Sequence, residues 1–257
     1  MTSVAIDADV AEGFGVWAVD DGPLLDEISA ANVACGFHAG DPDILRRACE
    51  ACVRRGVAIG AQVSYRDLAG FGRRFLDVAP ATLVNEVVYQ IGALDGLARV
   101  AGGRVSYVKA HGALYNTTAR HAGHAAALVE AVALVDRGLP LLCQPGTEVW
   151  RRAVDAGLTP LAEVFADRGY TREGLLVPRS DPGALITDPA GAAARVVDAV
   201  VTGHVTSVDG VRVPLGADVA AVCVHSDTPG AAAIAAAVRA ALAVAGVQIG
   251  APAGVML

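Results

Sequence analysis

The sequence predicts an α/β fold in which strand and helix alternate about seven times, so that helices cover a parallel sheet. Short apolar runs of strand length alternate with longer segments of helical periodicity. Start and stop signals flank these segments, with Asp-Pro at Asp41-Pro42 and Asp188-Pro189 and glycine at Gly56 and Gly203. We expect one domain over residues 1–257, a closed barrel of about seven or eight strands. The alternative, an open doubly wound sheet, is disfavoured because no Gly-x-Gly-x-x-Gly follows the first strand.

The strand candidates are short apolar runs bounded by Gly, Pro or charged residues, as expected for strands buried on both faces. They are residues 4–10, 32–37, 57–61, 105–108, 139–143, 160–165 and 219–224, with a hairpin at 205–214 that turns at Asp209-Gly210. The helix candidates are residues 24–30, 42–55, 80–101, 118–137, 146–156 and 189–202, and a last helix that opens at Thr228-Pro229. A long loop rich in Gly, Pro and Arg follows the sixth strand through Gly183, and loops of this length are usually functional or disordered.

Composition and charge exclude several classes of protein. Hydrophobic residues make up 54% of the chain but aromatic residues only 5%, so Ala, Val, Leu and Ile must fill the core. A formal charge of −7 without clustered Lys and Arg excludes nucleic acid as a partner. The N-terminal residues lack the basic region of a secretory signal, and the apolar segment 229–247 carries Arg239, which favours a core helix over a membrane span. We therefore expect a cytoplasmic protein that contacts no membrane.

The five cysteines are scattered through apolar runs and favour reduced thiols. Cys49 and Cys52 lie in one predicted helix with no second pair to complete a zinc site, so we expect both to be small core residues.

Polar side chains follow the strands at the points where the strands end. Three strands end in polar pairs spaced i, i+2, which are Asp7 and Asp9, Lys109 and His111, and His225 and Asp227. His38 and Asp41 follow the second strand, and Glu163 and Asp167 close the sixth. Because this spacing points both side chains of a pair the same way, we predict that Asp9, His38, Lys109, His111 and His225 converge on one pocket.

Plainer roles are available to some of these residues. Asp41 and Asp227 are suited to helix caps, and Lys109 to a structural ion pair with Asp9. Two chemistries remain open for the group as a whole. Carboxylates and histidines could hold a divalent metal that activates water, or Lys109 beside a histidine and carboxylates could perform acid–base chemistry without metal. The loop Gly70-Phe-Gly-Arg-Arg74 adds two guanidinium groups suited to a carboxylate or phosphate, or forms a solvated turn.

Several motifs in the same order resemble the LamB/YcsF family, the A subunits of bacterial ATP-dependent 5-oxoprolinases. They are Asn32-Val-Ala-Cys-Gly-Phe-His-Ala-Gly-Asp-Pro42, Gly70-Phe-Gly-Arg-Arg74, Tyr89-Gln-Ile-Gly-Ala-Leu94, His111-Gly-Ala-Leu-Tyr-Asn116, Glu163-Val-Phe-Ala-Asp-Arg168 and Cys223-Val-His225. The resemblance spans nearly the whole chain. It implies a (β/α)7 barrel similar to the glycoside hydrolase/deacetylase barrel. It also implies opening of the lactam of 5-oxoproline to L-glutamate with ATP hydrolysis, together with two further subunits.

The resemblance and the strand-end pattern give the expected roles of the site residues. The predicted catalytic residues are Asp9, Lys109, His111 and Glu163. The predicted substrate or nucleotide-binding residues are Glu12, His38, Arg73, Arg74, Asn116, Arg168, His225 and Asp227. The expected cofactor is ATP with its magnesium ion, and no Gly-x-x-x-x-Gly-Lys-Ser/Thr motif is present, so any ATP site is not a P-loop.

The chain departs from the family at Asp7, Gln62, Ala110 and Ser226, where the family usually has Asn, His, Pro and Gly. An amide is a weaker ligand than imidazole, so Gln62 predicts that the purified protein holds no transition metal tightly. We also predict that the isolated chain does not open 5-oxoproline at a useful rate. Alanine at Lys109 or His111 is expected to abolish turnover while the unfolding midpoint stays within a few degrees. Two other functions remain open, a metal-dependent amide hydrolase without ATP and a non-catalytic scaffold subunit.

Overall fold

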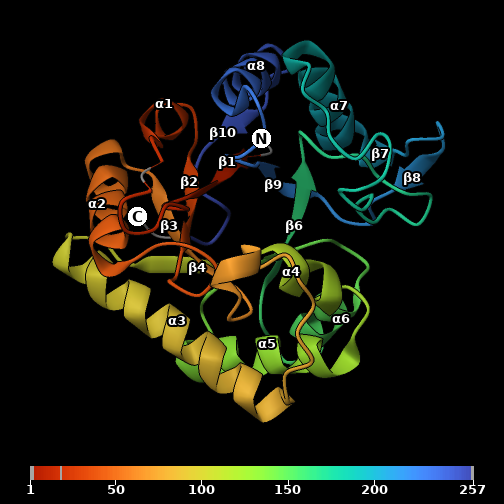
Figure 1. The fold of residues 1–257 in the computed structure, drawn as a ribbon. Coiled ribbons are helices and arrows are strands. Elements are labelled where there is room, and N and C mark those ends of the chain that lie inside the picture. Colours follow the sequence, from red (N-terminus) through yellow and green to blue (C-terminus); the bar gives the residue numbers. More distant parts are fainter. Residues whose placement is uncertain (1–2, 18, 256–257) are drawn as a thin grey trace.

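The computed structural model describes residues 3–17 and 19–255, and its centre is a closed barrel of seven parallel strands (Figure 1). The barrel strands, in spatial order, are β1 (Ser3–Val10), β2 (Ala30–Ala34), β3 (Ala58–Val63), β4 (Val105–Ala110), β5 (Leu141–Cys143), β6 (Pro160–Phe165) and β9 (Val219–Val224). Pairing of β9 with β1 closes the barrel. The (β/α)7 barrel is confirmed, and the open sheet is excluded. The predicted hairpin is present as β7 (His204–Thr206) and β8 (Arg212–Pro214), and β10 (Gln248–Ile249) pairs with the start of β1.

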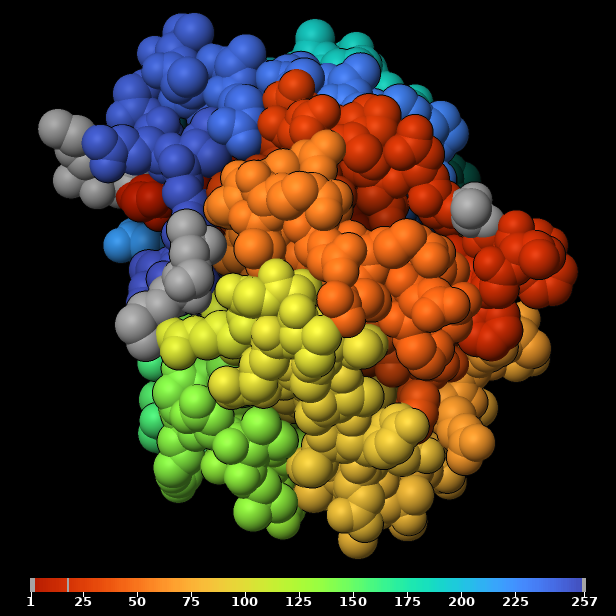
Figure 2. Space-filling model, turned by 90° about the vertical axis from the view of Figure 1, so that its left-hand side faces the viewer, coloured from red at the N-terminus to blue at the C-terminus, as the bar shows by residue number. Residues whose placement is uncertain are grey.

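Helices surround the barrel, and α2 and α3 lie side by side on its outside (Figure 2). The helices are α1 (Gly22–Leu25), α2 (Pro42–Arg55), the 3₁₀ turn η1 (Leu68–Gly70), α3 (Pro80–Val100), α4 (Gly112–Thr118), α5 (Ala122–Val135), α6 (Glu148–Asp155), α7 (Pro189–Thr202) and α8 (Ala231–Val244). The predicted caps are confirmed, since Asp41 accepts from the Ile44 N–H at 2.9 Å and Asp188 from the Gly191 N–H at 2.8 Å. None of the helices in the described part of the chain has the length and apolarity needed to cross a membrane.

The helix predicted over residues 118–137 is wrong, because two helices, α4 and α5, occupy the region from residue 112 to 135. The helical conformation is interrupted at residues 119–121. There the His121 ring accepts a hydrogen bond from the His124 N–H and caps α5. A histidine cap is weak as a sequence signal, because Ser, Thr, Asp and Asn are the usual side chains at this position.

The second strand lies earlier than predicted, at β2 instead of residues 32–37. Gly36, at a φ of 87°, turns the backbone before His38, and α1 ends well before β2 begins. His38 therefore lies in the turn between β2 and α2 and not directly at a strand end.

Side chains inside the barrel form layers, because alternate residues of each strand point inward. The lower layer is apolar and consists of Ala5, Ala30, Ala58, Tyr107, Leu142, Leu161 and Ala221. Two and four residues further along the same strands lie Asp7, Asp9, Asn32, Gln62, Lys109, Glu163, Cys223 and His225, all of them buried. The barrel is thus apolar at one end and polar toward the carboxyl ends of its strands. The two buried cysteines of α2, Cys49 and Cys52, belong to the outer core as predicted.

We expect Gly60→Ala to destabilise the protein by about 3 kcal/mol, because a rigid ring occupies the space that a side chain needs. A Cβ at Gly60 would lie 2.1 Å from Cζ of Tyr107, whose hydroxyl donates to Asn32 at 2.8 Å. Gly92→Ala is the matched control, because its Cβ would meet nothing within 4 Å on α3. Urea unfolding measures both variants. Equal free energies of unfolding for the two would contradict this account of the barrel interior.

Candidate active site

A buried network of charges fills the polar end of the barrel. Lys109 Nζ lies 2.8 Å from Asp9 Oδ1 and 3.5 Å from Glu163 Oε1, and it also contacts Cys223 Sγ at 3.2 Å. The Asn32 side chain, from β2, donates to Asp7 at 2.6 Å and to Asp9 at 3.0 Å. The two aspartates of β1 therefore share the inward face, as the i, i+2 spacing predicts.

The network divides its carboxyl groups into charged and neutral forms. Burial alone would raise the pKa of Asp9, but the Lys109 ammonium holds it well below its usual range. Burial also opposes the charge on Lys109, yet Asp9 and the other nearby acids raise the pKa of the lysine. For Glu163 and Asp7, the effect of burial is larger than that of the Lys109 charge. Burial raises the pKa of Glu163 to about 8 and the pKa of Asp7 above its usual value. The interior therefore holds an ionised Asp9–Lys109 pair next to a protonated Glu163.

Glu163 should make the protein less stable as the pH rises through neutrality. Its pKa is about 8 in the folded state against an ordinary 4.5, so the stabilisation is complete below about pH 4.5 and is lost as the pH approaches 8. We expect Glu163 to contribute a fall of about 2–4 kcal/mol in the free energy of unfolding between pH 5 and 8, measured as the difference between the wild type and Glu163→Gln. Denaturant unfolding at several pH values measures the slope. Glu130→Gln, on the exposed face of α5, is the control, and identical slopes in both variants would show that Glu163 does not titrate in this range.

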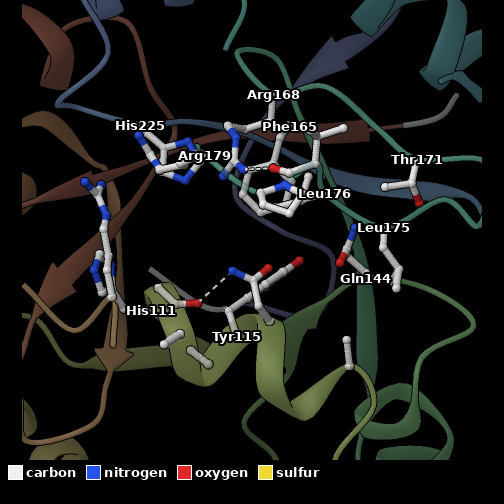
Figure 3. Close-up of a pocket in the computed structure, with 18 of the residues that line it drawn as sticks. His111, Tyr115, Gln144, Phe165, Arg168, Thr171, Leu175, Leu176, Arg179 and His225 are labelled. Carbon is white, nitrogen blue, oxygen red and sulfur yellow. Dashed lines mark hydrogen bonds between the residues drawn. The ribbon is translucent and has the colours of Figure 1, made fainter. Parts of the chain in front are cut away.

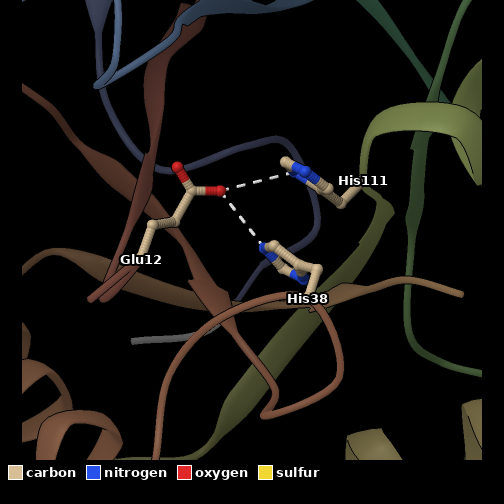
Figure 4. Close-up of side chains that lie close together, drawn as sticks. All are labelled: Glu12, His38 and His111. Atoms are coloured by element: carbon tan, nitrogen blue, oxygen red, sulfur yellow. Dashed lines mark hydrogen bonds and ion pairs between the residues drawn. The ribbon is translucent and has the colours of Figure 1, made fainter. Parts of the chain in front are cut away.

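Two stacked histidines flank Glu12 at the edge of the network (Figure 4). The rings of His38 and His111 are parallel within 10°, with centroids 3.8 Å apart. Glu12 Oε1 lies 3.2 Å from His38 Nε2 and 3.4 Å from His111 Nδ1. Gln62 donates its amide hydrogen to His111 Nδ1 at 2.9 Å, and burial lowers the pKa of His38 to about 4. The carboxylate thus faces two imidazoles, of which His38 is neutral at neutral pH.

An acid–histidine pair occupies the neighbouring strand ends. His225 Nδ1 lies 3.0 Å from Asp167 Oδ1, and the Thr228 hydroxyl also donates to Asp167. Burial alone would raise the pKa of Asp167, but His225 and Thr228 lower it below its usual value. The ring of His225 stacks on Phe165, with centroids 5.3 Å apart. An ionised Asp167 therefore orients His225 and leaves Nε2 as the ring nitrogen available to a ligand.

A cavity of about 640 Å³ opens over these groups (Figure 3). Asp9, Lys109, His111 and His225 line its floor, and the loop after β6 supplies one wall, including Leu176 and Arg179. Figure 3 shows Tyr115, from α4, on the other side of the cavity from His225 and Arg168. The cavity is large enough for a small polar ligand and is lined by both apolar and charged groups.

Four arginines line the cavity, Arg73, Arg120, Arg168 and Arg179, and two of them share one partner. Arg73 lies 2.8 Å from Asp227 and 4.8 Å over the ring of Phe71. Arg179 lies 3.4 Å from the same aspartate.

Arg168 is buried and donates to the backbone oxygens of Val177 at 2.6 Å and Ala184 at 3.1 Å. Burial and the nearby Arg179 charge lower the pKa of Arg168 to about 10. Arg168 thus fixes the loop after β6, while Arg73 and Arg179 present charge at the mouth.

The structure brings most of the predicted site residues together. Asp9, Arg73, Lys109, His111, Asn116, Arg168 and His225 line the cavity, and Glu12, His38, Glu163 and Asp227 contact these lining residues or their partners. Arg74 is different, because its guanidinium lies outside the cavity lining and is bound to Asp67 at the start of η1. We therefore assign Arg74 to the fold of its loop and not to a ligand. Asp227 holds Arg73 and Arg179 and does not cap α8, whose cap position is Gly230.

Sequence reasoning gave no site role to several groups that line or support the cavity, among them Asp167, Arg179 and Gln144. Asp167 lies two residues after β6, among the polar strand ends described above, so its position was a usable signal. Arg179 and Gln144 gave none, because one lies within a long loop and the other is a single amide after the short strand β5. Only the folded chain brings them to the same cavity as His225.

The fold and the site define a (β/α)7-barrel protein whose buried acid–base groups open into a cavity at the carboxyl ends of the strands. Residues 4–256 match the model of the LamB/YcsF family, and the chain belongs to that family. It is 56% identical over 250 residues to the 5-oxoprolinase A subunit of Mycobacterium avium (strain 104), covering 97% of this chain and 98% of the relative. It is 53% identical over 249 residues to the protein of that name from Streptomyces coelicolor, covering 96% of this chain and 99% of the relative. The crystal structure of a lactam utilization protein from Thermus thermophilus superposes with a TM-score of 0.91 at 41% identity, covering 97% of this chain and all of that one.

Proposed function

We propose that this chain is the A subunit of an ATP-dependent 5-oxoprolinase and that its barrel cavity binds 5-oxo-L-proline during opening of the lactam. Relatives that span 97% of the chain at 56% identity carry that subunit name, and a structural relative is named for lactam utilization. The observation that carries the proposal is the cavity itself, where cationic groups at the mouth stand over a floor of buried acid–base groups. The proposal includes two further subunits, and ATP with its magnesium ion as co-substrate.

The cavity suits a small cyclic amide that bears a carboxylate. Arg73 and Arg179 already share the carboxylate of Asp227 at 2.8 and 3.4 Å, so a substrate carboxylate would find the same type of partner at the mouth. The ring of the substrate would then lie against the aromatic pair of Phe165 and Tyr115, which contact each other edge to face at 5.4 Å. This orientation directs the lactam bond toward Lys109 and His225.

The buried groups can support the opening reaction. An amide is a poor electrophile, and transfer of the ATP γ-phosphoryl group to the lactam oxygen makes its carbon reactive toward water. Water then adds to that carbon while His225, oriented by Asp167, takes the proton. The C–N bond breaks as the nitrogen accepts a proton, which leaves an acyl phosphate, and a second water hydrolyses that acyl phosphate to L-glutamate and inorganic phosphate. Lys109 stabilises the negative charge that develops on oxygen.

One observation favours a second function, an amide hydrolase that depends on a metal and not on ATP. Glu12, His38 and His111 form a compact group of potential ligand atoms within 4.8 Å of one another. Isothermal titration of the chain with 5-oxoproline, with a non-hydrolysable ATP analogue and with zinc separates the two functions. A scaffold subunit would bind none of the three in the cavity.

Reconstitution with the two partner subunits tests the proposed function. We expect glutamate to form from 5-oxoproline and ATP only when all subunits are present, and His225→Ala to abolish that turnover, because His225 is the proposed base. His204→Ala, on β7 and outside the cavity lining, is the matched control and should keep full turnover. Full activity from the isolated chain would refute the subunit role. Wild-type turnover by the His225→Ala complex would place the chemistry outside this cavity.

A further inference from the structure

The segment over residues 14–19, here called the Trp17 loop, carries more exposed large apolar side chains than any other segment of that length in the described part of the chain. The exposed side chains are Phe14, Val16, Trp17 and Val19, which retain 37%, 91%, 73% and 50% of their accessible surface. The chain has only two tryptophans, and the other, Trp150, packs against the core. Single exposed apolar residues are ordinary on a protein surface, but a group of them marks an interaction site.

Backbone hydrogen bonds hold the first part of the Trp17 loop in a fixed shape. The Phe14 N–H donates to the Trp17 carbonyl at 2.9 Å, and the Trp17 N–H donates to the Phe14 carbonyl at 3.0 Å. Gly15, at a φ of 57°, lies inside this tight turn, and its N–H donates to Asp41 at the start of α2 at 2.8 Å. Because the turn is already formed, a protein that binds it orders little additional chain.

The Trp17 loop lies at the rim of the barrel cavity, because it follows the carboxyl end of β1. Glu12, just before the loop, still contacts the site, since it lies 3.2 Å from His38 and accepts from the Ser226 hydroxyl at 3.1 Å. The chain then turns outward, and in Figure 2 this red segment projects at the right-hand edge of the molecule. A protein bound to the Trp17 loop would therefore lie beside the site.

We infer that the Trp17 loop is a docking contact for a partner subunit, which receives Val16 and Trp17 in an apolar pocket edged by Lys or Arg. The inference rests on the proposed function, in which the chain works with further subunits, as the name of its relatives indicates. Tryptophan is among the side chains that contribute most to binding at protein interfaces. The basic edge follows from Asp20, next to the loop, and Asp43, in the first turn of α2, which are both exposed.

A second copy of this chain fits the Trp17 loop less well than a different protein does. A two-fold axis through the loop would place two projecting turns against each other. Six residues on each side are far fewer than the roughly 20–30 residues a side of a stable interface. A different protein can instead surround the loop and contact the rest of the rim, beside the groups proposed to act on 5-oxoproline.

Fluorine NMR of the chain labelled with 5-fluorotryptophan tests the inference directly, because unlabelled partner subunits give no signal. We expect the Trp17 resonance to shift when the partner subunits are added, since its indole ring leaves water. The Trp150 resonance, from a ring packed against the core on α6, is the internal control and should stay in place. A Trp17 resonance that does not respond to bound partners would overturn the inference.

Binding measurements with variants give the second test. Trp17→Ser and Val16→Asp should each weaken association with the partner subunits at least tenfold. Val244→Asp, at a position 90% exposed at the end of α8, is the matched control for Val16→Asp and should bind as the wild type does. Thermal unfolding shows that each variant is folded. Unchanged association in both Trp17→Ser and Val16→Asp would overturn the inference.

The charges beside the loop have their own test. The double variant Asp20→Asn/Asp43→Asn should associate more slowly than the wild type, because charges at the edge of an interface act mainly on the association rate. An unchanged rate would contradict the basic edge of the partner's pocket.

Sedimentation of the isolated chain examines a second copy as the occupant. A dimer that Trp17→Ser dissociates would overturn the inference. None of these measurements needs 5-oxoproline or ATP, so they are separate from turnover. Partner subunits that bind through the Trp17 loop without forming glutamate would support the inference and refute only the proposed reaction. Partner subunits that do not bind the wild-type chain would refute the subunit role and the inference together.

Discussion

Lys109→Met should unfold more easily than the wild type by about 3–5 kcal/mol near neutral pH, and the reconstituted complex should lose glutamate formation. The ammonium is 3% exposed and lies against Asp9 and Glu163, with Asp7 in the same layer. Its removal leaves buried carboxyl groups without a counter-charge, and they must be protonated or bear the cost of desolvation. The loss should therefore shrink at acidic pH, where protons neutralise the carboxyl groups.

Denaturant unfolding and a double-mutant cycle with Asp9→Asn measure this effect. The double variant should be more stable than the sum of the single losses predicts, because it removes both members of the pair. Arg104→Met, at an exposed position before β4, is the control and should change stability by less than about 0.5 kcal/mol. A loss below about 1 kcal/mol in Lys109→Met would contradict the buried network, since exposed ion pairs contribute that little.

Asp167→Asn should reduce turnover by the complex about 10²- to 10⁴-fold, because an amide does not hold His225 in the required tautomer or stabilise its charged form. The Michaelis constant for 5-oxoproline should change much less, since Asp167 contacts His225 and Thr228 and does not line the cavity. Steady-state kinetics with saturating ATP separate the two constants. Asp155→Asn, at the exposed end of α6, is the matched control. A rise in the Michaelis constant with unchanged turnover would assign Asp167 to binding.

The Asp167→Asn variant should also differ from the wild type in how its stability depends on acid pH. The folded-state pKa of Asp167 is lowered, so the stability it contributes is present above the unfolded pKa near 3.8 and is lost as the pH falls through the folded value. The stability difference between wild type and Asp167→Asn should therefore be constant above about pH 5 and should shrink below about pH 4. Acid unfolding curves of both proteins measure it.

The barrel follows from local signals that act within one turn or one strand. Asp41 and Asp188 set helix starts through a single hydrogen bond each, and the i, i+2 pairs set the inward faces of β1 and β4. Local chemistry of this kind can be read from the order of residues. The prediction of helix ends failed where the capping residue was unusual, as at His121, whose ring caps α5.

The expectations that depended on distance between chain segments were less successful. The sequence placed Lys109 at an open mouth, where its loss should cost little stability, but closure of the barrel leaves the side chain 3% exposed. We therefore expect removal of the Lys109 ammonium to cause a large loss in the free energy of unfolding. Arg74 and Arg73 are neighbours with the same chemistry, yet one binds Asp67 at the surface and the other reaches Asp227, 154 residues away in sequence. Only the path of the loop decides between them.

Lys109 is the only lysine in the chain, and all other cationic side chains apart from histidine are arginines. The burial of this one side chain removes the ε-amine from the surface, where amine-reactive reagents attack. Apart from the terminal amine, an amine-reactive reagent can reach the native protein only through the cavity whose floor Lys109 lines. The rate of acylation would thus report access to the position that the substrate is expected to occupy. A ligand seated over Lys109 should slow this labelling in proportion to the fraction of cavities that it occupies.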